Sequence, residues 1–155
     1  MNVEMINPFI TSTVNALSTM AFIVPQRGQP GVKINEPAPV SDISGVIGLS
    51  GDANGWVSIG LSRQLSLKVA ENMLGEPKTY IDADVRDAVG EIVNMIAGGA
   101  KSELSQKGFS FKLAIPTVIV GDQHQIAQKK NIPYVHIPFN SAEGVFFICV
   151  CLHKE

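Results

Sequence analysis

The feature that most constrains the fold is a repeat of the chain's own sequence. Three pairs of segments match: residues 12–17 with 91–96, 33–37 with 112–116, and 55–59 with 144–148. The first two pairs share one offset, because the spacing from Asn15 to Asn94 equals the spacing from Pro37 to Pro116. Chance similarity between short apolar segments would not require a common offset. The repeat therefore predicts two similar structural units.

Hydrophobic periodicity predicts that each unit is a helix followed by three strands. Two such units give an α+β fold, with a largely antiparallel sheet packed with long helices. We expect a single domain over residues 1–155, with pseudo-repeats at about 3–74 and 82–155. The expected helices cover residues 3–23, 62–74 and 82–106. The expected strands cover 32–39, 43–49, 56–61, 112–116, 117–121, 134–139 and 145–152, the last two joined by a five-residue loop at 140–144.

The composition excludes several classes of function. Apolar residues make up 45% of the 155 residues, which is typical of a globular protein. The formal net charge of -2 predicts no basic surface for nucleic acid. The longest apolar run, residues 145–152, is too short to span a bilayer, and the N-terminal residues do not resemble a signal peptide. We therefore expect a cytoplasmic protein with no membrane partner.

The two cysteines predict neither a disulfide nor a metal site. Cys149 and Cys151 are two residues apart in an expected strand, so both side chains point to the same side. Disulfide geometry disfavours a bridge at that spacing. A metal site that also uses His153 lacks a second pair of ligands. We expect both cysteines to be buried, reduced residues.

Four residues of the expected third helix form a polar stripe. Asp87, Glu91, Asn94 and Gly98 are spaced by four, three and four residues, which places them on one helix face. The pair of acidic residues costs about 0.2–0.5 kcal/mol. An interior Asn costs roughly 0.5 kcal/mol, and an interior Gly up to about 1 kcal/mol. Stability alone would not select this stripe, although an ordinary solvated helix face remains the alternative interpretation.

The stripe and a later proline resemble a known signature. The pattern Asp87-x3-Glu91-x2-Asn94-x21-Pro116 is similar to the motif of the CheC/CheX/FliY family of chemotaxis phosphatases. The surrounding residues 90–98 are also similar to that family. The order of the expected elements agrees with the family over most of the chain.

The resemblance implies a function for the stripe. The family dephosphorylates the aspartyl phosphate of CheY-type response regulators, so Asn94 would orient the attacking water and Glu91 would dock the partner. Asp87, Gly98 and Pro116 would support this site. The resemblance implies no cofactor or metal for this chain, with Mg²⁺ expected on the partner regulator. An adaptor of the same fold, related to the flagellar switch and without turnover, is the alternative.

The first copy of the repeat departs from the two-site pattern of the CheC-like members. It keeps Asn15 and Pro37, but Ser12 stands at the glutamate position, so this second site is expected to be degenerate. A one-site chain of this length is most like CheX, which implies a homodimer. A small-ligand sensor with a large buried pocket is a third alternative. His124 and His136 lack an accompanying nucleophile motif, so we expect no catalytic role for them.

Overall fold

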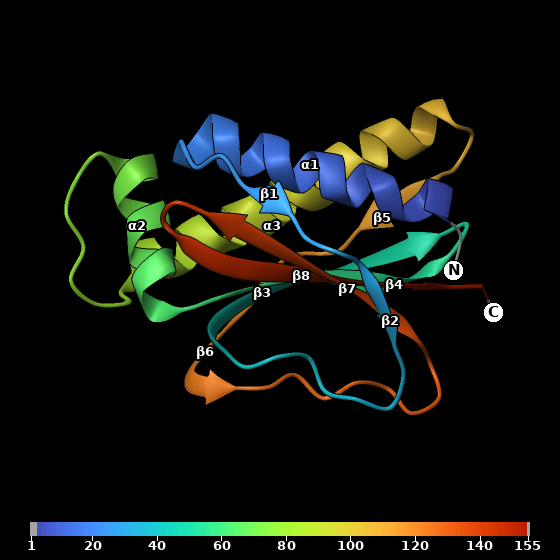
Figure 1. Cartoon of the computed structure of the whole chain (residues 1–155). Helices are drawn as coiled ribbons and strands as arrows, with labels where there is room; N and C mark the ends of the chain where they lie inside the picture. Colours follow the sequence, from blue (N-terminus) through green and yellow to red (C-terminus); the bar gives the residue numbers. More distant parts are fainter. Residues whose placement is uncertain (1–2, 155) are drawn as a thin grey trace.

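The structure is a computed structural model that describes residues 3–154. It confirms the α+β fold, in which helices lie along one face of a mainly antiparallel sheet (Figure 1). The three helices are α1 (Val3–Ala21), α2 (Arg63–Leu74) and α3 (Ala83–Gln106). The strands are β1 (Gln26–Arg27), β2 (Gly31–Lys33), β3 (Ser41–Gly51), β4 (Asn54–Leu61), β5 (Phe111–Leu113), β6 (Thr117–His124), β7 (Tyr134–Ser141) and β8 (Gly144–His153).

The helix boundaries follow from residues that the sequence supplies. The Ser62 hydroxyl accepts a hydrogen bond from the Leu65 amide at the start of α2. Gly75 ends the same helix at a φ of 74°, a left-handed conformation that favours glycine. Asp82 caps α3 by accepting a hydrogen bond from the amide of Val85. These caps satisfy backbone groups that a helix end leaves unpaired.

The sheet is arranged symmetrically about its centre, with equivalent strands of the two halves at equal distances from it. The central path is β7-β8-β4-β3, with β1 and β2 pairing with β7, and β5 and β6 pairing with β3. Each half of the chain thus contributes a hairpin to the centre and two outer strands that pair with the other half's hairpin. The first half has four strands rather than the three expected, because its outer segment is divided into β1 and β2, whereas the four strands expected in the second half are all present.

Two predicted strand segments differ from the structure. The strand expected at 32–39 is limited to Gly31–Lys33, and β1 lies between the expected first helix and this strand, where no strand was expected. Pro37 and Pro39 cannot donate to a strand ladder, and residues 34–40 form no strand. The expected five-residue loop at 140–144 is also wrong, since Ser141 pairs directly with Gly144 in a tight hairpin.

The main core lies between the sheet and the helices α1 and α3. It includes the fully buried Phe9 and Leu17 of α1 and Ile92 and Ile96 of α3. A smaller cluster on the opposite face contains Tyr134, Phe147 and the two cysteines. Both cysteines are free and buried, as predicted.

Candidate functional site

The polar stripe belongs to a helix that is firmly held in the core. Nine residues of α3 are buried, and they follow the helical spacing that seats one side of the helix on the sheet. At its start, the amide of Val85 and the ammonium group of Lys78 lower the pKa of the Asp82 carboxyl. Lys78 also pairs with Asp84. The backbone beneath the stripe is therefore fixed before any partner arrives.

The stripe itself faces solvent. Asp87, Glu91 and Asn94 are exposed, and Gly98 is half-buried. Within the part of the chain that the structure describes, none of the three polar side chains has a hydrogen-bond or ion-pair partner. The Asn94 amide can therefore donate hydrogen bonds to molecules outside the chain and accept hydrogen bonds from them.

Pro116 and two glycines shape the surroundings of the stripe. Pro116 immediately precedes β6, and a Cβ added to Gly90 of α3 would lie 3.4 Å from Val118 of that strand. A Cβ on Gly98 would meet nothing within 4 Å, so the absence of a side chain there leaves open space over the helix. That open space permits another backbone to approach closely.

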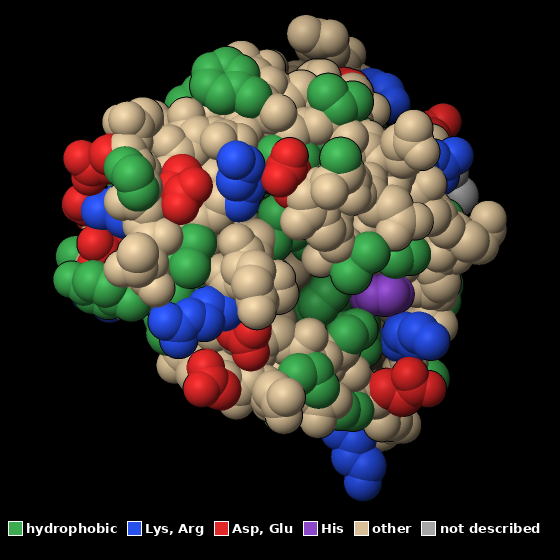
Figure 2. Space-filling view, turned by 60° about the vertical axis from the view of Figure 1, so that its left-hand side comes forward, with side chains coloured by type: hydrophobic (Ala, Val, Ile, Leu, Met, Phe, Trp, Pro, Cys, Tyr) green, Lys and Arg blue, Asp and Glu red, His purple; other side chains and the backbone are tan. Residues whose placement is uncertain are grey.

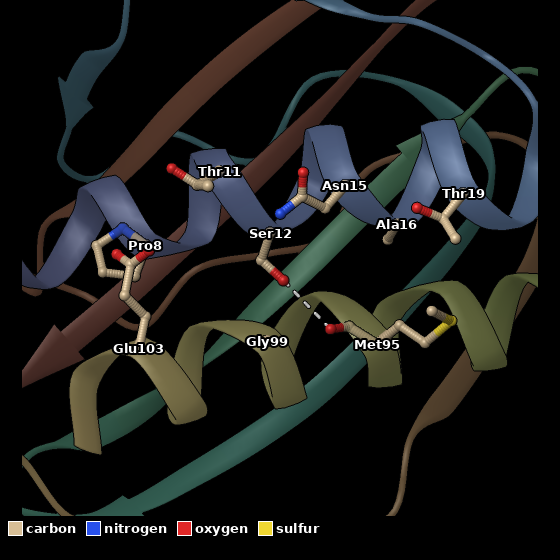
Figure 3. A pocket seen from close by; sticks show the side chains of 9 residues that line it. All are labelled: Pro8, Thr11, Ser12, Asn15, Ala16, Thr19, Met95, Gly99 and Glu103. Carbon is tan, nitrogen blue, oxygen red and sulfur yellow. Dashed lines mark hydrogen bonds between the residues drawn. The ribbon is translucent and has the colours of Figure 1, made fainter. Parts of the chain in front are cut away.

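A shallow groove separates α3 from α1 (Figure 3). Ser12 of α1 crosses this groove and donates its hydroxyl to the carbonyl oxygen of Ile96 at 2.7 Å. Asn15 lies exposed in the same groove, without a hydrogen-bond partner in the described chain. The groove encloses about 220 Å³ and is lined by Pro8, Thr11, Ser12, Asn15, Ala16, Thr19, Met95, Gly99 and Glu103.

The structure does not bring the three residues of the expected degenerate site together. Ser12 is buried and Asn15 lies in the groove between the helices. Pro37 lines a different hollow with Ala127 and Gln128, beside the cluster on the other side of the sheet. The backbone carbonyl of Pro37 accepts a hydrogen bond from the Tyr134 hydroxyl, which is part of that cluster. The repeat alignment that grouped these three residues therefore finds no support in the fold.

A hollow that sequence reasoning missed lies beside the first half of α1. It encloses about 400 Å³ and includes the exposed side chain of Asn7. The available signal was a second pattern of the same kind, Glu4-x2-Asn7-x22-Pro30. The lining residues are Ile6, Asn7, Ile10, Arg27, Gln29, Pro30, Gly31, Val32 and Val135.

Hydrogen bonds or burial account for His124, His136 and Cys149 without a catalytic role. His124 is held by the hydroxyl of Ser44 at 2.8 Å and the carbonyl oxygen of Gly121 at 2.7 Å. Burial lowers the pKa of His136. Burial raises the pKa of Cys149 to about 12, so its thiol is protonated at neutral pH and is a poor nucleophile. No cluster of His, Cys, Asp and Glu within residues 3–154 has the geometry to hold a metal ion.

The surface carries charges of both signs. Acidic and basic side chains are interspersed on the face drawn in Figure 2, which shows no extended basic area. Such an area would be needed to bind a phosphate backbone without sequence preference. Among residues 3–154, no helix is long and apolar enough to cross a membrane.

Comparisons with known proteins agree with this geometry. The family described as chemotaxis phosphatase CheX matches residues 43–140. The CheY-P phosphatase CheX of Thermotoga maritima is 29% identical over 122 residues, which is 78% of each chain. The chemotaxis protein CheX of Desulfovibrio desulfuricans has a TM-score of 0.91 at 43% identity, covering 97% of this chain and 100% of that chain.

A further solved structure shares the fold at lower identity. It is a complex of CheX, CheY, BeF₃ and Mg²⁺ from Borrelia burgdorferi, with a TM-score of 0.82 at 24% identity, covering 99% of this chain and 100% of that chain. At this identity, the likeness establishes the fold alone. Because the family match spans more than half of the sequence, this chain belongs to the chemotaxis phosphatase CheX family.

Proposed function

We propose that this chain hydrolyses the aspartyl phosphate of a CheY-type response regulator at the exposed face of α3. The observation that carries the proposal is the pair of Glu91 and Asn94, exposed and unpartnered on a rigid helix within the described chain. The Thermotoga maritima relative, named a CheY-P phosphatase, supports the substrate class. We place the protein in the cytoplasm, because response regulators work there.

The division of labour between the two side chains follows from their chemistry. An acyl phosphate is already activated, so its hydrolysis mainly requires a positioned water and a stabilised charge. The Asn94 amide can accept a hydrogen bond from water with its oxygen and donate one to the phosphoryl group with its nitrogen. The Glu91 carboxylate would hold a cationic side chain of the regulator. Asp87, one helical turn before Glu91, would add negative charge to the surface that attracts this cation.

The magnesium ion required for this chemistry would come from the partner. The Borrelia burgdorferi complex contains CheX, CheY, BeF₃ and Mg²⁺ together. We propose that the ion sits in the regulator and that this chain supplies only the amide and the docking carboxylate. Glu91, Asn94 and Asp87 would then act on a phosphoryl group whose charge the partner has partly neutralised.

The decisive experiment follows the decay of a phosphorylated CheY-type regulator with the wild-type chain and with Asn94→Ala. We expect the substitution to slow the decay while binding of the BeF₃-activated regulator is retained. Asn94→Gln is the matched control, because it keeps the amide but moves it by one methylene, so it should also slow the decay. Unchanged decay with Asn94→Ala would contradict the proposal, and binding without any turnover by the wild type would favour the adaptor.

We also propose that the chain forms a homodimer through an open sheet edge. Within the described chain, strand β6 pairs only with β3, and it carries the exposed Ile119 and Val120. Ile115, just before the strand, is 88% exposed. Apolar side chains on an unpaired edge favour association with another chain. Sedimentation equilibrium should show a dimer that Val120→Lys weakens, and a monomeric wild type would refute this assembly.

A further inference from the structure

The strand pairing identifies the true counterpart of Pro116. In the outer pair β3–β6, Gly45 lies opposite Val118, and in the outer pair β7–β2, Val135 lies opposite Val32. In β3, the residues that face the helices, counted back from the β3–β4 hairpin, are Leu49, Ile47 and Gly45. In β7, counted back from the β7–β8 hairpin, they are Phe139, Ile137 and Val135. Gly45 and Val135 therefore hold the same place in their strands. Val118 and Val32 are therefore equivalent. The residues two positions earlier, Pro116 and Pro30, are equivalent as well.

The ends of the two long helices identify a second pair of equivalent residues. The amide of Phe109 donates to the carbonyl oxygen of Leu104 at 2.9 Å, and the amide of Ile23 donates to that of Leu17 at 3.1 Å. Each bond closes a helix C-terminus, with Gly108 and Phe22 in a left-handed conformation just before it. The first copy has one more residue in this turn than the second. Leu17 of α1 thus corresponds to Leu104 of α3.

Burial along the two helices agrees with this correspondence. When positions are counted back from Leu17 and from Leu104, five buried positions of the two helices coincide, whereas Pro8, Ser12 and Ala16 are buried only in α1. Met5, Ile6, Phe9, Ile10 and Thr13 of α1 correspond to Ile92, Val93, Ile96, Ala97 and Ala100 of α3, and all of them are buried. Ser12 then corresponds to Gly99, and these two residues touch where the helices cross. The crossing lies at the pseudo-two-fold axis that relates the halves.

This correspondence places Glu4 and Asn7 of α1 where Glu91 and Asn94 stand on α3. Both Glu4 and Asn7 are exposed, as their counterparts are. The spacing to the proline is Asn7-x22-Pro30 in the first half and Asn94-x21-Pro116 in the second. The difference of one is the extra residue at the end of α1. The first half of the chain therefore carries the Glu, Asn and Pro of the pattern in the same structural positions, with Thr11 where the second half has Gly98.

The surroundings of Asn7 suit a phosphorylated partner. Asn7 has no hydrogen-bond partner in the described chain, and it shares the hollow of about 400 Å³ with Arg27 and Pro30. Arg27 pairs with Phe139 as Leu113 pairs with Leu49, so Arg27 and Leu113 are equivalent. The first half therefore has a cationic side chain where the second half has an apolar one. A guanidinium group favours phosphoryl oxygens, because its fork of N–H donors matches their geometry.

We propose that α1 carries a second working site, in which Asn7 orients water and Glu4 docks a second copy of the same phosphorylated regulator. The proposal rests on the function proposed for α3. The water oxygen bonds to phosphorus while the bond from phosphorus to the aspartyl oxygen breaks. The products are inorganic phosphate, which keeps the protons of the water, and the free carboxylate of the regulator. Arg27 stabilises the phosphoryl charge during this step.

Three variants test the site by the decay of the phosphorylated regulator: Asn7→Ala, Asn94→Ala and the double variant. If the two sites act independently, each single variant loses a part of the rate, roughly half for equal sites, and the double variant returns to spontaneous decay. Asn15→Ala tests the competing alignment, in which the sequence repeat makes Asn15 the counterpart of Asn94. A loss of rate with Asn15→Ala and none with Asn7→Ala would overturn the proposal.

Binding stoichiometry separates this proposal from the function on which it rests. Titration calorimetry with the BeF₃-activated regulator should give two regulators per chain for the wild type. Glu4→Arg should leave one. One regulator per wild-type chain, together with an active enzyme and an unaffected Asn7→Ala, would overturn the second site alone. A wild type that neither binds nor dephosphorylates the regulator would overturn both proposals. Circular dichroism melting confirms that each variant is folded.

Discussion

The two halves of the molecule hold the same pair of Glu and Asn, followed by a Pro, on differently packed supports. In the second half, α3 lies close to β6, where Gly90 leaves space for Val118 at 3.4 Å from an added Cβ. In the first half, the corresponding Val32 is 69% exposed, and a hollow opens between α1 and β2. The comparison shows that a duplicated fold can preserve a pair of polar residues on the exposed face of a helix while the packing beneath it diverges.

This difference suggests distinct properties for the two faces. The α3 face is the more closely packed on its neighbouring strand, so we expect its amide to be better positioned for a reaction that depends on orientation. The α1 face has the hollow and Arg27, which favour binding of an anionic group. We expect the α3 face to be faster in turnover and the α1 face to be more sensitive to salt, because the attraction of an exposed cation is screened.

The largest effects should come from the residues that anchor each helix. Phe9 and Ile96 are equivalent and fully buried. Truncating Phe9 to Ala should lower the free energy of unfolding by about 3–5 kcal/mol, and truncating Ile96 to Ala by about 2–5 kcal/mol. Urea titration measures both losses. A loss below about 1 kcal/mol for Phe9→Ala would show that α1 is not anchored as α3 is.

The crossing of the helices should be the next most sensitive point. A Cβ at Gly99 would collide with the Ser12 hydroxyl, which holds α1 to α3 through the carbonyl oxygen of Ile96. We expect Gly99→Val to destabilise the fold by about 1–3 kcal/mol. Thermal unfolding provides the measurement. Stability equal to the wild type would mean that the two helices separate without cost.

The neighbouring glycine should respond in the opposite direction. A Cβ at Gly98 meets nothing within 4 Å, and helical Gly is less favourable than Ala, so Gly98→Ala should stabilise the chain by about 0.5–1 kcal/mol. The added methyl group should nonetheless slow dephosphorylation, because it occupies the open space beside Asn94. If the variant were both more stable and fully active, Gly98 would have no part in docking.

The smallest effect should be an acid sensitivity at the start of α3. The amide of Val85 and the ammonium group of Lys78 lower the pKa of Asp82 in the folded state. The stabilisation is therefore present above the unfolded pKa of about 4 and is lost as pH falls through the lower folded value. The protection of the first-turn amides of α3 against hydrogen exchange, relative to the intrinsic rate at each pH, should fall below about pH 4. Asp82→Asn, which keeps a capping oxygen, should flatten this dependence.

Local signals explain why much of the fold could be predicted. The helix starts at Ser62 and Asp82 and the stop at Gly75 depend on neighbouring residues only, so the sequence reveals them. The central hairpins also follow from alternating apolar residues. The short strands β1 and β2 could not be found in this way, because they pair with β7, which lies in the other half of the chain.

The repeat shows how a correct pattern can be aligned incorrectly. The alignment read from the sequence matches Asn15 to Asn94, whereas the structure matches Asn7 to Asn94. Asn7 and Asn15 are eight residues apart, a rotation of roughly 80° around α1, which is less than the width of an apolar helix stripe of about 100°. Helical periodicity alone therefore could not distinguish the two alignments. The strand register beside Pro30 and the burial of Ser12 do distinguish them.

The most direct measurement of the central claim is a nuclear magnetic resonance map of where the BeF₃-activated regulator contacts this chain. We predict that amide signals shift along α3 from Asp87 to Gly98 and near Pro116, and that a second set shifts around Asn7 and Pro30. Shifts confined to the opposite side of the sheet, around Tyr134 and the loop at 34–40, would contradict both docking faces.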